Sequence, residues 1–170
     1  PIPHLTKEEI QSLLAPDAVL DFDTPSFRSW LASQHLLRNS DETALEFLRR
    51  AQATLQTRIE YAGQRHTVEH AHNLAEEAPD EKLRMHCHGC SLSLLSILRA
   101  NHIPCRAIAV HCGLEGLSKM SDPAKPFPSF LPINHIESGH TFVEVFLPGL
   151  GFVPVEPQAD FTGREQMLGD

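Results

Sequence analysis

The sequence predicts an α+β fold: a helical N-terminal half, followed by a buried cysteine-bearing helix that packs on an antiparallel sheet. Three observations carry this prediction. Apolar residues recur at helical spacing through the first third of the chain. The run over 87–101 is apolar enough for a buried helix. The segments 140–147 and 151–155 have the composition of strands and are joined by a PGLG turn, so we expect them to pair antiparallel.

Each of the first three predicted helices has a start signal. Thr6 followed by Glu9 has the form of a capping box. Pro25 behind Thr24 marks a second start, and a third helix is expected from Asp41. Apolar side chains at helical spacing should face the core: Ile10, Leu13, Leu14, Phe27, Trp30, Leu31, Leu37, Leu45, Phe47, Leu48, Ala51 and Leu55.

The middle of the chain alternates between strand-like and polar segments. TRIEY (57–61) has the alternation of a short strand. A polar helix or loop is expected over 66–83. Pro104 ends the buried helix, and PCRAIAVHC (104–112) has the small and β-branched residues of a further strand.

A long proline-rich stretch, 113–139, precedes the final hairpin. Loops of this length in a compact domain are functional or disordered. Its apolar residues, Phe127, Phe130, Leu131 and Ile133, are unusual for a disordered linker. We interpret it as a proline-stiffened flap over a site, with an ordered surface excursion as the alternative.

Length, charge and cysteine content limit the class of protein. The 170 residues predict one domain, with a helical N-terminal part at 1–56. A net charge of −8 without a basic block argues against nucleic acid as a partner. No apolar run approaches the roughly 20 residues that span a bilayer, so no membrane partner is expected. Four cysteines clustered in one quarter of the chain favour a reducing, cytoplasmic setting.

The motif HCHGC (86–90) has three interpretations. A zinc site would use the Cys87 and Cys90 pair, but a second pair at a suitable spacing is missing, because neighbours on a strand point to opposite faces. A redox motif would also use these two cysteines, yet a helical half precedes them instead of the first strand of a βαβ unit. His66 and His70 lie one helical turn apart without an acidic or cysteine partner at a diagnostic offset, so we expect solvent-facing histidines. Neither a metal nor a cofactor is predicted.

The third interpretation is a nucleophile. Cys87 would open a helix, where the N-terminal field and free N–H groups favour the thiolate. His140 begins a strand after a glycine and could act as its base. Glu156 follows 16 residues later, beyond one hairpin turn, and could orient the ring. The three side chains therefore come from three elements that can meet.

Two segments resemble the transglutaminase-like superfamily of papain-type enzymes. The stretch C-x-x-x-S-x-x-x-x-x-x-L-R-A-x-x-I-P-C-R (87–106) is similar to the cysteine helix of that family, which ends in LLRA-x-GIPAR. HTFVEVFLPGLGFVPVEP (140–157) resembles its HAWVEVYLPGxGWVPVDP segment. A weaker match is the helix and IEY before the cysteine, so the resemblance covers roughly residues 57–158 and implies that they form the catalytic core of a single transglutaminase-like domain.

The resemblance implies a transglutaminase-like, papain-like fold and a role for each motif residue. Register from the Ile-Pro pair assigns the nucleophile to Cys87 and leaves Cys90 as a packing residue one turn later. It implies His140 as general base and acid and Glu156 as the orienting carboxylate, where the family usually has Asp. The family often has Gly where this chain has Met85. The oxyanion hole would use the Cys87 N–H and a second donor, for which Gln64 and Tyr61 are candidates.

The expected function is cysteine-dependent acyl transfer on amide or peptide bonds through a thioester. With water as acceptor the enzyme is a peptidase or amidase, and with an amine it is a transglutaminase or amide synthase. The partner would be a peptide, protein or small amide substrate. No acidic cluster has calcium-loop spacing, so calcium activation is not predicted. The alternatives are an inactive binding module that uses the proline-rich loop and, with less support, a CxxC redox or zinc protein.

Overall fold

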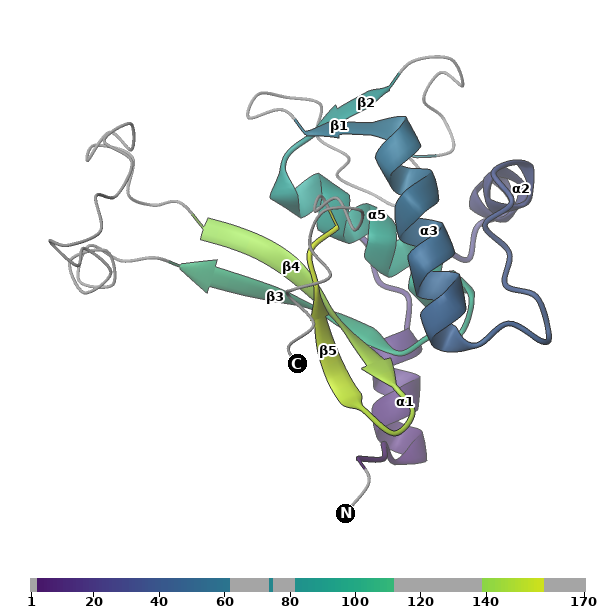
Figure 1. The fold of residues 1–170 in the computed structure, drawn as a ribbon, viewed down its shortest axis with the longest axis vertical. Coiled ribbons are helices and arrows are strands. Elements are labelled where there is room, and N and C mark those ends of the chain that lie inside the picture. The colour runs from purple at the N-terminus through teal and green to yellow at the C-terminus, as the bar shows by residue number, and fades with distance from the viewer. Residues whose placement is uncertain (1–2, 62–73, 75–81, 112–138, 158–170) are drawn as a thin grey trace, which may run out of the picture.

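A computed structural model describes residues 3–61, 74, 82–111 and 139–157 (Figure 1). Its helices are α1 (Lys7–Leu14), α2 (Pro25–Ser33), α3 (Ala44–Arg58) and α5 (Cys87–Ala100). Its strands are β1 (Ile59–Tyr61), β2 (Leu83–Met85), β3 (Cys105–His111), β4 (Gly139–Leu147) and β5 (Gly151–Val155). This mixture of helices and an antiparallel sheet confirms the predicted fold class.

Threonine N-caps set the starts of the first three helices, because a side-chain oxygen satisfies a backbone N–H that has no partner inside the helix. Thr6 and Glu9 form the predicted capping box. The Thr24 side chain accepts from the Phe27 N–H, and Pro25 takes the first helical position. The third helix begins at Ala44 and not at Asp41, because Thr43 provides the cap in a second capping box.

The three-stranded sheet has the order β3-β4-β5, and both pairs are antiparallel, as predicted. Val145 pairs with Cys105 on one side and with Val153 on the other. The turn between β4 and β5 contains Gly149 and Gly151 at φ values of 86° and 84°, where a side chain would be strained. The PGLG sequence therefore closes the hairpin and fixes its register.

Helix α5 lies at the centre of the molecule, between this sheet and α3 (Figure 1). Ten consecutive residues, Gly89 to Leu98, are buried because neighbouring elements surround the helix. The core-facing positions of β4 are Val143, Val145 and Leu147, which alternate with half-buried residues. The dense apolar pattern of 87–101 thus reflects burial on all sides, as the sequence predicted.

Four expectations about the elements are wrong. No residue of α1 is buried, so its apolar residues are only half-covered and not core. Leu37 is 49% exposed because it lies in the connection after α2 and not on a helix face. The strand predicted over 57–61 begins at Ile59, since the first two residues extend α3. Strand β2, which pairs in parallel with β1, begins at Leu83, the last residue of the segment 66–83 that was expected to be a polar helix or loop.

Several predictions fall on residues outside the described part of the chain. These are the proline-rich flap, most of the polar segment, and the residues His66, His70, His72, Gln64 and Cys112. They stay predictions.

Candidate active site

Cys87 is the first residue of α5 and follows directly on β2. His86 is the N-cap: its Nδ1 accepts from the His88 N–H at 3.3 Å, and its carbonyl accepts the first helical bond, from the Cys90 N–H at 3.1 Å. The Cys87 side chain is half-buried, whereas Cys90, one turn later, is 1% exposed. At the start of α5, Cys87 is therefore partly accessible to solvent, whereas Cys90 is buried.

Two other cysteines are buried thiols. Burial, with smaller contributions from the negative charges of Cys87 and Glu156, raises the pKa of the Cys90 thiol to about 12. Burial likewise raises the pKa of Cys105 to about 12. Both thiols stay protonated near neutral pH and behave as small apolar side chains.

His140 and Glu156 form a hydrogen-bonded pair, with 2.5 Å between Nε2 and Oε2. Their side chains are 38% and 31% exposed. Glu156 comes directly after β5, and continuing the β4–β5 register places it opposite Phe142. Phe142 lies two residues after His140 on the same strand face, and the two rings stack with centroids 6.5 Å apart. The hairpin thus brings the carboxylate to the ring, as the sequence predicted.

This contact determines which ring nitrogen can act as a base. A carboxylate accepts hydrogen bonds, so the ring must donate its Nε2–H to Glu156. In the neutral ring the lone pair then resides on Nδ1. Nδ1 is therefore the atom available to take a proton from a thiol.

Two buried side chains connect the pair to the helices. Ser91, one turn after Cys87, donates its hydroxyl to the Thr141 carbonyl at 2.9 Å. Gln52 on α3 donates its amide to the Glu156 carbonyl at 2.8 Å. The first bond places the first turns of α5 beside the start of β4, and the second fixes the chain at the end of β5. Cys87 and His140 therefore lie at neighbouring ends of packed elements.

Of the three predicted residues, Cys87, His140 and Glu156, only the last two are in direct hydrogen-bond contact in the described part of the chain. Cys87 and Glu156 are near enough for both to act electrostatically on Cys90. Within the described residues, however, no hydrogen bond joins the Cys87 thiol to the His140 ring. His140 and Glu156 are therefore paired, and the Cys87 thiol makes no hydrogen bond to that pair among the described residues.

The chain matches the sequence model of the transglutaminase-like superfamily over residues 32–157, which is most of its length. It belongs to the transglutaminase-like superfamily. The match begins within α2 and ends one residue after Glu156, so it includes Gln52 on α3 as well as the three predicted site residues. No curated protein was found to match this transglutaminase-like chain.

Solved structures share the transglutaminase-like fold at low sequence identity. The periplasmic domain of TgpA from Pseudomonas aeruginosa aligns with a TM-score of 0.58 and 13% identity, over 90% of this chain and 48% of that one. The same domain bound to ethylmercury aligns with a TM-score of 0.58 and 14% identity, over 90% and 49%. A protein from Cytophaga hutchinsonii described as a candidate cysteine protease aligns with a TM-score of 0.56 and 14% identity, over 93% and 44%. The transglutaminase-like chain thus spans less than half of each neighbour.

Gln52 and Ser91 were not predicted from the sequence as parts of the site. Gln52 interrupts the apolar face of α3, between Ala51 and Leu55, and a polar residue on a core face is a signal that could have marked it. Ser91 belongs to the C-x-x-x-S pattern of the transglutaminase-like segment, but its contact with β4 depends on tertiary packing. Of the two candidate oxyanion donors, Gln64 lies outside the described residues, and Tyr61 is placed only as the end of β1.

The described residues contain no group of three or more His, Cys, Asp or Glu side chains that could hold a metal ion. Across the same residues, the helices are all too short or too polar to span a bilayer.

Proposed function

We propose that this chain is a cysteine-dependent acyl-transfer enzyme that acts on amide or peptide bonds through a thioester at Cys87. The observation that carries the proposal is the His140–Glu156 pair, 2.5 Å apart, in a domain whose cysteine-bearing helix is docked on the same sheet. Membership of the transglutaminase-like superfamily supports it. The candidate protease from Cytophaga hutchinsonii is a structural neighbour consistent with it.

The first half-reaction acylates the thiol. Nδ1 of His140 takes the proton from Cys87, and the sulfur attacks the carbonyl carbon of the substrate. The carbonyl electrons move to the oxygen and return as the C–N bond breaks. The departing nitrogen receives the proton from His140, which leaves a free amine and a thioester on Cys87.

The second half-reaction regenerates the thiol. His140 takes a proton from the acceptor, which attacks the thioester carbon. The C–S bond breaks, and the sulfur regains the proton from His140. Water as acceptor gives a carboxylic acid, and an amine gives a new amide. The Glu156 carboxylate stabilises the imidazolium formed in each half-reaction.

Peptides, proteins or small amides are the proposed substrates, because each offers the carbonyl that the thiol attacks.

The proposed setting is cytoplasmic, supported by the three free thiols at Cys87, Cys90 and Cys105 among the described residues. TgpA, in contrast, provides a periplasmic domain as neighbour. Fractionation of the native cell tests this setting, since recovery of the protein in the periplasm would exclude it.

A second candidate is an inactive binding module with the same fold. The missing hydrogen bond between Cys87 and His140 favours this alternative. A thiol that never reaches the ring would receive no help from a base.

Mass spectrometry of the intact chain after incubation with a panel of amide substrates separates the two candidates. The enzyme should carry an acyl group on Cys87 and release amine, and Cys87→Ala should abolish both. Cys90→Ala is the matched control, because that thiol is buried and should leave turnover unchanged. Acyl groups on no cysteine, across peptide and small amide substrates, would reject the enzyme and favour the binding module.

A further inference from the structure

Gln52 is a fully buried polar side chain on the core face of α3. Its neighbours on that helix face, Leu48, Ala51 and Leu55, are buried apolar residues. Burying an amide is unfavourable unless its polar atoms find partners. Gln52 satisfies only half of this requirement, because its Oε1 has no hydrogen-bond partner among the described residues.

The N–H group of the Gln52 amide makes one specific contact. Nε2 of Gln52 donates to the main-chain carbonyl of Glu156 at 2.8 Å, across 104 residues of sequence. Glu156 lies just past the end of β5, whose pairing with β4 ends at Val155. The next residue is Pro157, which has no N–H to offer to the sheet. The Gln52 amide therefore holds the chain at the point where the ladder ends.

We propose that Gln52 is a positioning residue for the acyl-transfer reaction, acting through the Glu156 backbone on the His140 ring. This inference rests on the proposed function. The chain of contacts runs from the Gln52 amide to the Glu156 carbonyl, and from the Glu156 carboxylate to Nε2 of His140. Each contact is a direct hydrogen bond, so a shift of Glu156 is transmitted to the ring.

Stability alone gives little reason for a polar residue here, because Gln52 brings an unpaired buried Oε1 together with one hydrogen bond. Replacing the amide by an apolar group removes the unpaired oxygen but leaves the Glu156 carbonyl without this donor, so the two effects on folding oppose each other. The orientation of the ring, in contrast, requires the carboxylate at hydrogen-bond distance, and that distance is short. A displacement of about 1 Å near a reacting group can reduce a rate on the order of 10²-fold.

Two variants of Gln52 separate positioning from packing. Gln52→Met keeps the length and fills the space but has no N–H donor. Gln52→Glu keeps the shape and can donate only while the introduced carboxyl is protonated. Leu48→Met is the matched control, a change of similar size on the same buried face of α3 without a contact to Glu156.

The first readout follows the His140 ring directly and needs no substrate. In ¹⁵N-histidine-labelled protein, the Nε2–H proton held by Glu156 should give a downfield resonance that is missing in His140→Ala. Gln52→Met should weaken or shift this resonance, and Leu48→Met should leave it in place. Gln52→Glu should keep it at acid pH and lose it as the pH rises, because the ionised carboxylate cannot donate.

The second readout is the rate of Cys87 acylation, with urea unfolding as the check on folding. Gln52→Met should lower kcat by about 10-fold or more with little change in KM, while the unfolding midpoint changes little, because the lost hydrogen bond and the removed unpaired oxygen have opposite effects on folding. Should Gln52→Met fail to fold, the pH dependence of the ring resonance in Gln52→Glu provides the same test within one folded variant.

A wild-type ring resonance in Gln52→Met, together with wild-type pH behaviour in Gln52→Glu, would overturn the positioning role. The proposed function can fail separately. If the wild-type chain forms no acyl-enzyme, the acyl-transfer proposal is rejected, yet the ring resonance still reports whether Gln52 holds the Glu156–His140 pair.

Discussion

At the scale of single residues, Glu156 departs from the family pattern that this chain resembles, in which Asp is usual at this position. The carboxylate still reaches Nε2 of His140 at 2.5 Å. The extra methylene of Glu moves the carboxylate further from its backbone, and the backbone carbonyl is itself bonded to Gln52. The departure from the family pattern therefore preserves the contact that orients the ring.

Replacing Glu156 by Gln should lower the acylation rate constant on the order of 10²- to 10⁴-fold, because the amide keeps the shape but removes the charge that stabilises the imidazolium. Glu156→Asp is the control, since it keeps the charge and should retain more activity than Glu156→Gln. Stopped-flow measurement of amine release on a small amide substrate checks both. Acylation by Glu156→Gln at the wild-type rate would show that the carboxylate does not assist His140.

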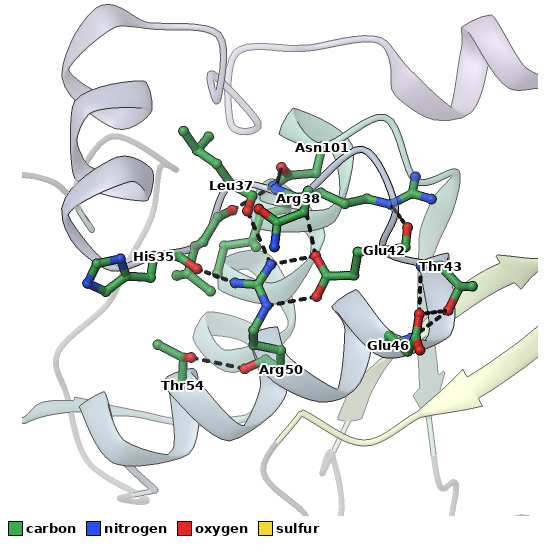
Figure 2. Close-up of polar contacts among 12 residues, drawn as sticks. His35, Leu37, Arg38, Glu42, Thr43, Glu46, Arg50, Thr54 and Asn101 are labelled. Carbon is green, nitrogen blue, oxygen red and sulfur yellow. Dashed lines mark hydrogen bonds and ion pairs between the residues drawn. The ribbon is translucent and has the colours of Figure 1, made fainter.

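At the scale of elements, the connection between α2 and α3 is held by Arg50 (Figure 2). Its guanidinium donates twice to the Glu42 carboxylate, at 2.8 and 2.6 Å. It also donates to the carbonyls of His35 and Leu37. The Asn101 side chain, directly after α5, accepts from the Arg38 N–H at 2.8 Å, so this connection is joined to the end of α5 as well.

Glu42→Gln should cost about 1–2 kcal/mol of unfolding free energy at neutral pH, because the paired carboxylate loses its charge. The hydrogen bond from Arg50 lowers the pKa of Glu42 below its ordinary value of 4.5 in the folded chain. A lowered folded-state pKa stabilises the fold above about pH 4.5, and the contribution disappears as the pH falls through the folded value. The difference between wild type and Glu42→Gln should therefore shrink in acid.

Urea unfolding at a series of pH values from neutral to acid measures the difference in unfolding free energy between the wild type and Glu42→Gln. The control is Glu144→Gln on the outer face of the sheet, where the partner Arg106 has a 48% exposed side chain. That exposed pair should contribute less than about 1 kcal/mol. A Glu42→Gln effect that is equal to the control, or that grows in acid, would contradict the role given to the Arg50 pair.

Some helices and strands could be predicted from local sequence patterns, and others could not. Capping boxes and the PGLG turn are local signals, so the starts of α1 and α2 and the β4–β5 hairpin were predicted from the sequence. Strand β2 has three residues, too few for a period-2 pattern, and its parallel pairing with β1 depends on the chain between them. Helix α1 has an amphipathic pattern that does not reveal how little of it is covered.

At the scale of the whole molecule, the site depends on contacts between distant parts of the chain. The motifs at 87–106 and 140–157 were enough to predict Cys87, His140 and Glu156. The contact from Gln52 spans 104 residues, and that from Ser91 spans 50. The sequence can mark Gln52 as a polar residue on an apolar face, but it does not identify the partner in either contact, because each partner is fixed by how α3 and α5 pack on the sheet.

Because the Cys90 and Cys105 thiols are buried in the core, the free energy of unfolding of the domain should fall in alkali. Thiols ionise with a pKa of 9.0 when unperturbed, but burial raises the pKa of Cys90 and Cys105 to about 12. Between these values the unfolded chain loses protons that the folded chain keeps, so stability falls as the pH rises. Each thiol should contribute about 1.4 kcal/mol per pH unit at most.

Urea unfolding under reducing conditions, from neutral pH to about 10.5, checks this prediction. Cys105→Ala and Cys90→Ala should each be less stable than the wild type at neutral pH, because a buried side chain is truncated. Each should also lose stability less steeply in alkali. Slopes identical to the wild type would show that these thiols ionise equally in both states.

We propose above all that the His140–Glu156 pair makes the Cys87 thiol reactive. The most direct measurement is the rate of iodoacetamide alkylation at each cysteine, followed by mass spectrometry at neutral and mildly acid pH, in the wild type and in His140→Ala. We expect Cys87 to react far faster than Cys90 and Cys105, whose pKa of about 12 keeps them protonated, and we expect His140→Ala to remove most of that advantage. Equal rates at Cys87 with and without the His140 ring would contradict the claim.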